Sequence, residues 1–447
     1  MDPVLNGKKP HFRPVKGHSN PYRILLWLSL IVGGIWLYTK LQVGEVEPLF
    51  MATPTPTRTA NSYNVEAETQ FNAGNLDAAI AAYAEAARVE PDNPHLWAEL
   101  ARIQTYSSSL LSTDREHFER MQAALESIDR AIALSPDDAY VLAIRSLVLD
   151  WYAAAAMPFV SPEEVQSALN EAEKEATRSY TLDPTNALAL AFYAEILIDQ
   201  QKWAQAEQYI EQAAELEPNS MDVHRVYGYV WENLGQYRLA IEEYQKAADI
   251  TPNLTFLYVF IGRNFRSIQV HNRALEYFEK AANINQQKGI TDPVPYIEIA
   301  KTYARDGEFF VAALNAEKAL EFNPTNPNTY GQLASIYMSA RNYESAMPAF
   351  KCAVRGCTAE ENQTAQEVLD TSVDVEGLSL TSGTVGFYYV QYGSVLAALS
   401  RPDQNYCPEA LDVLADVHAK YPDDPIFNDI ITENQNICSR EELRARP

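Results

Sequence analysis

The sequence lacks the motifs that mark most enzyme active sites and metal centres. It contains no phosphate-binding G-x-x-x-x-G-K-[ST] loop, no G-x-G-x-x-G, no H-E-x-x-H and no G-x-S-x-G. The seven histidines are scattered, and none pairs with another at the spacing of metal ligands on a helix. We therefore expect no catalytic residues, no metal site and no cofactor.

Glycine and cysteine are also scarce. Only 17 of 447 residues are glycine, whereas alanine occurs in runs, and this composition favours helices over sheets. A hydrophobic content of 47% is enough to build a core, which excludes a disordered protein. The four cysteines all lie late in the chain and form no C-x-x-C pair, which excludes a typical zinc finger; they are Cys352, Cys357, Cys407 and Cys438.

An excess of positive charge occurs only at the N-terminus. The formal net charge is −25, but residues 1–23 hold five Lys and Arg against Asp2, a net of +4, which leaves −29 for the remainder. A body this acidic repels phosphate backbones, so we expect no nucleic-acid partner.

One long uncharged apolar run lies near the N-terminus. Residues 24–38 read ILLWLSLIVGGIWLY, and a helix over 23–41 would be long enough to cross the ~30 Å hydrocarbon core of a lipid bilayer. Basic residues precede this run, and Glu45 and Glu47 follow it. The positive-inside rule then predicts a single-pass membrane protein with a basic cytoplasmic tail at 1–22 and its body outside the cytoplasm.

Two other interpretations of this run stay open. A cleavable signal peptide has the same order of charges, although no A-x-A site follows and two tryptophans are unusual in its apolar region. A buried core helix normally keeps a polar face, which this run lacks. An uncleaved anchor is the interpretation that the sequence favours. The Thr/Pro-rich segment at 42–60 then predicts an extended, fairly stiff linker.

Five sets of residues recur at a spacing of 34 in the middle of the chain, which indicates a repeat architecture. Apolar residues within each unit recur at steps of three and four, so each unit should form two helices. A proline ends each second helix, and small residues would let the two helix axes approach closely. The sets are Pro184, Pro218, Pro252; Ala206, Ala240, Ala274; Ile210, Tyr244, Phe278; Ala213, Ala247, Ala281; and Leu197, Trp231, Phe265.

This pattern resembles the tetratricopeptide-repeat family. The fifth unit carries the family signature as His224, Tyr227, Gly228, Trp231, Ala240, Tyr244, Ala247 and Pro252. The resemblance implies an all-α fold, a right-handed α-solenoid of about nine helix-turn-helix repeats over 61–425. The second and third units insert about eleven and fourteen residues between their helices. An irregular insert follows at about 354–385, and 426–447 should form a capping helix and tail.

The resemblance also implies a binding surface, because members of this family bind partners on a concave groove lined by the first helices. The corresponding positions here hold five cations and two aromatic residues: Arg225, Tyr229, Phe256, Arg263, Arg266, Lys301 and Arg305. Cations within so acidic a body predict that the groove binds other proteins through acidic or carboxylate-bearing segments. Alternatively, the cations pair with acidic neighbours on the same face, which are Glu195, Asp222, Glu232 and Glu298.

Three functions are compatible with these features. The favoured one is a non-catalytic interaction scaffold, tethered to the lipid bilayer through residues 23–41 and binding other proteins outside the cytoplasm. A second is an assembly factor or holdase for an exported envelope complex. A third is the regulatory part of an enzyme such as a glycosyltransferase, but no stretch outside the repeats is long enough for a catalytic domain.

An oxidising compartment would permit disulfides among the four cysteines. Cys407 should open the second helix of the last unit and Cys438 should end the cap, so a bridge between them would fix the terminal helix. Cys352 and Cys357 are close enough in sequence to pair across a helix end. The alternative is four buried thiols.

Overall fold

The computed structural model describes residues 20–42, 58–369 and 373–444, and all of its regular elements are helices within those ranges. The chain divides into two compact units, Met1–Arg58 and Thr59–Pro447. In the first, α1 (Pro21–Gln42) is a single helix whose apolar side chains are exposed. The predicted tail at 1–22 lies outside the described residues except for 20–22, and the predicted linker at 42–60 except for 42 and 58–60.

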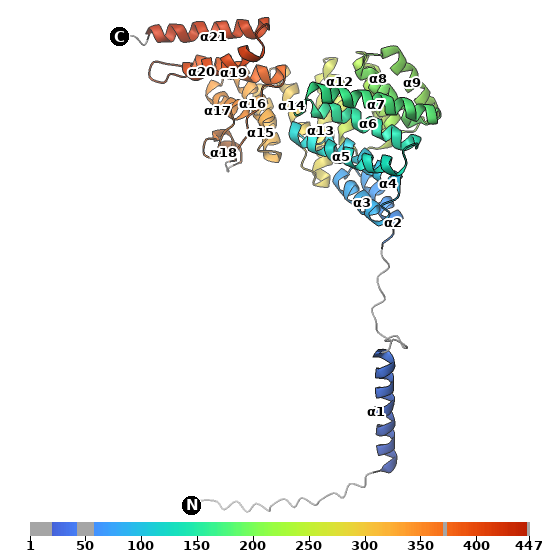
Figure 1. Cartoon of the computed structure of the whole chain (residues 1–447). Helices are drawn as coiled ribbons and strands as arrows, with labels where there is room; N and C mark the ends of the chain where they lie inside the picture. Colours follow the sequence, from blue (N-terminus) through green and yellow to red (C-terminus); the bar gives the residue numbers. More distant parts are fainter. Residues whose placement is uncertain (1–19, 43–57, 370–372, 445–447) are drawn as a thin grey trace, which may run out of the picture. The chain divides into compact units, whose positions relative to one another are not determined.

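In its described residues, the second unit is a solenoid of helices (Figure 1). These helices form nine pairs, which confirms the predicted all-α solenoid of about nine repeats. The pairs are α2 (Ala60–Asn72) with α3 (Leu76–Val89), α4 (Pro94–Ser108) with α5 (Asp114–Leu134), α6 (Ala139–Ala156) with α7 (Pro162–Leu182), α8 (Ala187–Asp199) with α9 (Trp203–Leu216), α10 (Met221–Asn233) with α11 (Tyr237–Ile250), α12 (Thr255–Ser267) with α13 (His271–Lys288), α14 (Val294–Arg305) with α15 (Phe309–Phe322), α16 (Pro327–Ser339) with α17 (Tyr343–Val354), and α19 (Gly383–Leu399) with α20 (Cys407–Lys420).

In two of the helix pairs, α10 with α11 and α12 with α13, the helices cross closely because a glycine faces an aromatic ring. A Cβ atom added to Gly228 would lie 2.7 Å from the Tyr244 ring, and one added to Gly262 would lie 2.4 Å from the Phe278 ring. Both distances are too short for a real Cβ atom, so these positions accept no larger residue without movement. The columns of small and large residues in the sequence therefore correspond to the packing of each helix pair.

The extra residues of the second and third units lengthen helices instead of forming long loops. The helices α5, α6 and α7 have 21, 18 and 21 residues, against 14 in α9 or α11. The turn before α5 is closed by a capping box, in which Glu116 N–H donates to the Thr113 hydroxyl and Thr113 N–H donates to the Glu116 carboxylate. This turn, residues 109–113, is thereby held in a defined shape.

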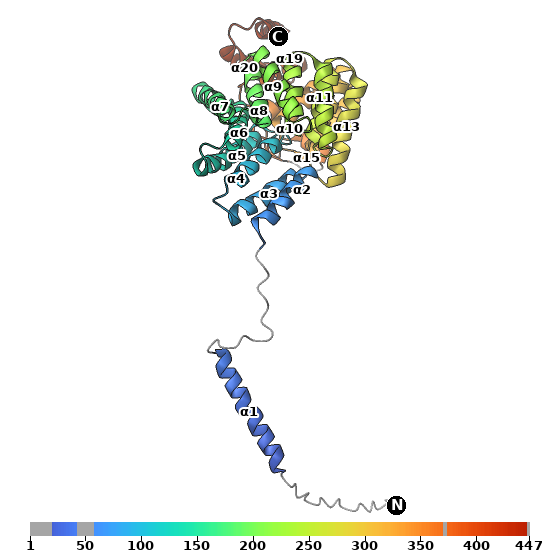
Figure 2. The ribbon, with the colours of Figure 1, turned by 90° about the vertical axis from the view of Figure 1, so that its right-hand side faces the viewer.

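The first two helix pairs fold back against later ones, which the repeat pattern did not predict. Asp222 at the start of α10 accepts hydrogen bonds from Arg102 and Tyr106 of α4, with 3.1 Å between Arg102 Nη1 and Asp222 Oδ2. Asn326, before α16, donates to the carbonyl oxygen of Ser112 at 3.0 Å. Figure 2 shows α2 and α3 next to the later helices. We call the contacts of α2–α5 with α10–α16 the closure contacts.

A third closure contact joins the turn between α2 and α3 to the loop after α11 and to the last residue of α13. Asn253 Nδ2 donates to the carbonyl oxygen of Asn72 at 2.9 Å, and the Lys288 ammonium donates to the carbonyl of Ala73. Gly74, with φ of +78°, lies so close that an added Cβ atom would be 2.2 Å from the Asn253 carbonyl oxygen. The backbone approach at this point therefore requires glycine.

The C-terminal helices have a hydrophobic core of their own, which extends from Ala300 in α14 to Cys438. The irregular segment after α17 contains the short helix α18 (Gln363–Leu369) and an isolated bridge between Cys357 and Val375. The last helix, α21 (Pro425–Arg444), buries Phe427 and Ile431 against this core. It therefore covers the apolar end of the solenoid, as a capping helix does.

Both cysteine pairs are disulfides in the structure, one joining Cys352 to Cys357 and one joining Cys407 to Cys438. The second pair closes a loop with a sequence separation of 31 and connects the start of α20 to the C-terminal half of α21. In the chain-entropy treatment, closing a loop of this length stabilises the folded state by about 3–4 kcal/mol.

Replacing Cys407 and Cys438 together by serine should therefore loosen α21. We expect amide exchange in α21 to accelerate by roughly two orders of magnitude, with little change in α10–α13. The control is Cys352→Ser with Cys357→Ser, which should leave α21 protected. Mass spectrometry of non-reduced peptides from native membranes tests the pairing itself, and four free thiols would contradict it.

Candidate functional site

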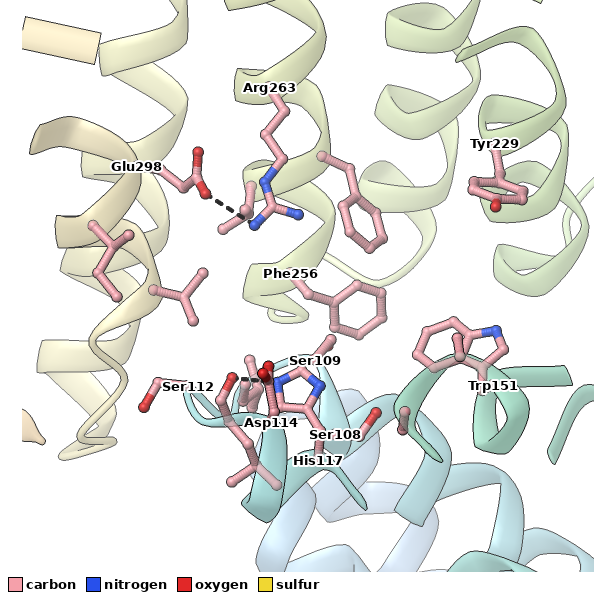
Figure 3. A pocket seen from close by; sticks show the side chains of 18 of the residues that line it. Ser108, Ser109, Ser112, Asp114, His117, Trp151, Tyr229, Phe256, Arg263 and Glu298 are labelled. Carbon is pink, nitrogen blue, oxygen red and sulfur yellow. Dashed lines mark hydrogen bonds and ion pairs between the residues drawn. The ribbon is translucent and has the colours of Figure 1, made fainter. Parts of the chain in front are cut away.

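A cavity of about 640 Å³ lies inside the second unit, between the turn that joins α4 to α5 and the helices α6, α8, α10, α12, α14 and α16. We call it the inner pocket. Its volume is within the range of sites that bind small molecules or short peptide segments. Figure 3 shows Trp151 and Tyr229 toward one side, Arg263 and Glu298 toward the other, and Phe256 between them.

The wall opposite α12 comes from the first repeats and is held there by the closure contacts. Ser108, Ser112 and His117 line it, from the end of α4 to the first turn of α5. The Ser112 hydroxyl accepts from Asn323 Nδ2 at 2.7 Å, in addition to the bond between its carbonyl and Asn326. The inner pocket therefore exists because the solenoid folds back on itself.

One end of the inner pocket is rich in carboxyl groups. Arg225 makes a two-pronged ion pair with Glu195, with distances of 2.8 and 2.6 Å, and its guanidinium faces the rings of Tyr106 and Trp151. Trp151 Nε1 donates to the same Glu195 carboxylate at 3.0 Å. Arg225 is only 2% exposed, so its guanidinium is paired with Glu195 inside the protein and is not presented to solvent.

Two further carboxyl groups lie beside this pair. Asp150 of α6 is 4% exposed, and its Oδ1 atom has no hydrogen-bond partner among the described residues. Burial, together with the nearby Asp199 and Glu195 carboxylates, raises the pKa of Asp150 well above its usual range. Asp199, at the end of α8, accepts a hydrogen bond of 2.6 Å from the Tyr229 hydroxyl. We call Asp150, Glu195 and Asp199 the carboxyl cluster.

The other end of the inner pocket is rich in cations. The Glu298 carboxylate, on α14, is within 3.0 Å of Arg263, 2.5 Å of Arg266 and 3.3 Å of Lys301. Burial alone would raise the pKa of Glu298, but these three cations together lower it. One carboxylate thus faces three cations, and the side chains of Arg263 and Lys301 stay 40% and 42% exposed. We call Arg263, Arg266 and Lys301 the cation cluster.

A buried aspartate lies near the cation cluster. Asp292 accepts hydrogen bonds from Val294 N–H at 2.9 Å and from Asn285 Nδ2 at 2.8 Å. Burial nevertheless raises its pKa to about 7. Its charge state therefore changes near neutral pH, at the edge of the inner pocket.

The structure brings together five of the seven residues that the sequence predicted for the groove. Arg225, Tyr229, Phe256, Arg263 and Lys301 line the inner pocket, although Arg225 and Phe256 are buried. The other two do not line it: Arg266 is buried against Glu298, and Arg305 is exposed at the end of α14. Two of the four acidic neighbours proposed as alternative partners, Glu195 and Glu298, do pair with these cations. Partner binding by these seven residues stays a prediction.

Sequence reasoning missed the residues that complete the pocket. Asp150 and Trp151 belong to an apolar helix, where a lone carboxylate between Leu149 and an aromatic residue was the available signal. The Ser108–Ser112 wall carries no such signal, because its role depends on contacts with residues more than 200 positions away.

Comparisons with known proteins agree with the repeat pattern. Two family models described as tetratricopeptide repeat match the chain, one at residues 64–105 and 194–254 and one at 327–355. A comparison with curated proteins finds no match.

Several solved structures resemble the chain. One is a tetratricopeptide repeat protein from Parabacteroides merdae ATCC 43184 (18% identity, 62% of this chain and 98% of that chain, TM-score 0.36). Another is a thermophilic protein of the same kind from Thermus thermophilus (18% identity, 47% and 100%, TM-score 0.38). A third is the Cut9–Hcn1 hetero-tetramer of the APC/C (15% identity, 91% and 82%, TM-score 0.43).

The raised pKa of Asp292 predicts a specific dependence of stability on pH. A carboxyl group whose pKa is raised on folding stabilises the folded state fully below its unfolded pKa near 4, and this stabilisation is lost as the pH rises to about 7. Asp292→Asn stays neutral throughout, and its amide can donate to Asn285 Oδ1, which accepts no hydrogen bond from the described part of the chain. The variant should therefore gain about 2–3 kcal/mol relative to the parent between pH 5 and pH 8.

Urea unfolding followed at both pH values measures this difference. Asp249→Asn, on the exposed surface of α11, is the matched control and should track the parent. Equal stability differences between Asp292→Asn and the parent at pH 5 and pH 8 would contradict the assignment.

Proposed function

Because the chain belongs to the tetratricopeptide-repeat family, we propose that it is a non-catalytic interaction scaffold, tethered to a membrane and binding other proteins outside the cytoplasm. Repeats of this family generally bind proteins. The proposed binding site rests on a single observation, the arrangement around Glu298. Arg263 and Lys301 are both about half exposed and share this one carboxylate, so one positive charge is left over.

The helix α1 supports the membrane anchor. Residues Pro21–Lys40 are apolar and long enough to cross a bilayer, and none of this stretch is buried. Ala139–Ala156, which is α6, meets the same criteria of length and composition, but most of it is buried in the solenoid core. The basic residues before α1 and the acidic residues after it support a cytoplasmic N-terminus.

Reporter fusions test this topology. With a periplasm-active reporter at the C-terminus we expect activity, and with a cytoplasm-active reporter at the same site we expect none, because the positive charges hold the N-terminus inside. The control is the same pair of fusions on a chain that lacks residues 1–42. Activity of the cytoplasm-active reporter at the C-terminus, together with inactivity of the periplasm-active reporter there, would contradict the proposed location.

The cation cluster supports a carboxylate-bearing ligand. Arg263 and Lys301 already share Glu298, but each is large and half-exposed and keeps donor atoms free to face the pocket. A guanidinium can hold a carboxylate with two parallel hydrogen bonds. Acidic surface elsewhere on the protein would repel such a ligand, so the cation cluster is its most favourable site.

Neutralising the two exposed cations should weaken binding. Arg263→Gln with Lys301→Gln leaves Glu298 paired to Arg266, so the fold should persist. We expect binding of a capped glutamate-containing peptide, followed by fluorescence anisotropy, to weaken about tenfold or more and to lose most of its salt dependence. Reversing the charge of Arg266 is a poorer test, because Arg266 is buried.

The matched control removes the same charge outside the pocket, through Arg238→Gln with Lys420→Gln, both exposed and neither among the groove residues. It should bind the peptide like the parent. If the pocket variant folds by circular dichroism and binds as tightly as this control, the cations serve only their internal ion pairs.

A further inference from the structure

The two ends of the inner pocket carry opposite and complementary imbalances of charge. At one end, Asp150, Glu195 and Asp199 face the single cation Arg225, and because the pKa of Asp150 is raised, that end keeps an excess of one negative charge. At the other end, Arg263, Arg266 and Lys301 face Glu298, and Asp292, whose pKa is about 7, is the second carboxyl group nearby. Phe256 lies between the two ends in Figure 3. A ligand of one charge would satisfy only one end.

The carboxyl cluster is only partly compensated from within the described part of the chain. Both terminal nitrogens of Arg225 are engaged by Glu195, which neutralises one of the three carboxyl groups. Asp199 accepts a hydrogen bond from the Tyr229 hydroxyl, and its closeness to Asp150 helps to raise the pKa of the Asp150 carboxyl. The charge left at this end is therefore the one negative charge that Asp150 and Asp199 share, which a bound cation would offset.

The walls at this end suit a positively charged group. Trp151 and Tyr229 both line the pocket there, and aromatic faces attract ammonium and guanidinium groups. The Trp151 ring already faces one guanidinium, that of Arg225, at 5.5 Å. A second cation would meet both the aromatic walls and the accessible Asp199 carboxylate.

We propose that the inner pocket binds a short peptide segment that carries both a basic side chain and a carboxylate, with the basic group at the carboxyl cluster and the carboxylate at Arg263 and Lys301. This inference rests on the proposed function, because it places the acidic part of the ligand at the same cations. The volume of about 640 Å³ admits a few residues and not a folded partner, so the ligand is an extended segment.

Binding of four kinds of capped peptide to the full chain tests the inference. The peptides share a glycine–serine backbone and contain glutamate only, lysine only, both residues at several spacings and in both orders, or neither. Fluorescence anisotropy at constant salt gives each affinity. The best peptide with both residues should bind about tenfold tighter than the glutamate peptide, because it adds a charged hydrogen-bonded contact.

Two variants assign the contributions to the two ends. Asp199→Asn keeps the acceptor for Tyr229 but removes the charge, so it should abolish the advantage of the lysine-containing peptide and leave the glutamate peptide unaffected. Arg263→Gln should weaken both peptides. Asp249→Asn, exposed on α11 outside the pocket, controls for the change in net charge. Near-ultraviolet circular dichroism verifies the fold of each variant.

The outcomes separate the two proposals. If the glutamate peptide binds but lysine adds nothing, or if Asp199→Asn leaves the lysine advantage intact, the inference is wrong and the proposed acidic ligand survives. If the glutamate peptide does not bind at all, the proposed ligand of the cation cluster is wrong. The inference is supported if the peptide with both residues binds more tightly than the glutamate peptide and if Asp199→Asn removes this difference without changing the affinity for the glutamate peptide.

Discussion

The arrangement of the second unit depends on one interaction, the hydrogen bonding of the buried Asp222 carboxylate. Asp222 lies at the start of α10, yet it accepts hydrogen bonds from Arg102 and Tyr106, which come from α4. A carboxylate with so little exposure requires charged or hydrogen-bonding partners, so separating α4 from α10 would leave it uncompensated. This energetic penalty opposes opening of the solenoid, and the aromatic stack of Tyr106 on Phe256 adds apolar contact at the same place.

Closure converts a concave face into a pocket with two chemically different ends. An open solenoid would present Arg225, Arg263 and Lys301 to solvent along one groove. In the closed unit, Arg225 is buried under Tyr106 and bound to Glu195, while Arg263 and Lys301 stay accessible. The chain as a whole is acidic, but the end of the inner pocket that holds Arg263 and Lys301 is not. The local balance of charge therefore decides which ligand each end of the pocket favours.

The sequence predicts the local parts of this structure well, because they depend on neighbouring residues. Gly228 and Tyr244 stand at fixed positions of a 34-residue unit, and their contact follows from the crossing of two helices in that unit. The closure contacts follow a different rule. Five complete helix pairs separate Ser112 from Asn323 and Asn326, so their contact depends on the curvature of all five, and neither residue type nor spacing indicates it. The carboxyl cluster lies on the neighbouring helices α6 and α8. Glu195 was named from the sequence as a possible partner of the cations, whereas Asp150 was missed because it lies within an apolar helix whose sequence is typical of a buried core.

The distance between the turn before α5 and the loop before α16 tests closure most directly. Asp114, the first residue of α5 after this turn, and Thr325, in the loop before α16, are exposed and lie close in sequence to the contacts of Ser112 with Asn323 and Asn326. Spin labels at these positions, measured by double electron–electron resonance with the four native cysteines oxidised, report the separation in solution. The closed solenoid predicts a single narrow distribution of distances between the two labels, at the short end of the range that this method can measure. A long or broad distribution in the otherwise folded protein would show an open solenoid and contradict the account.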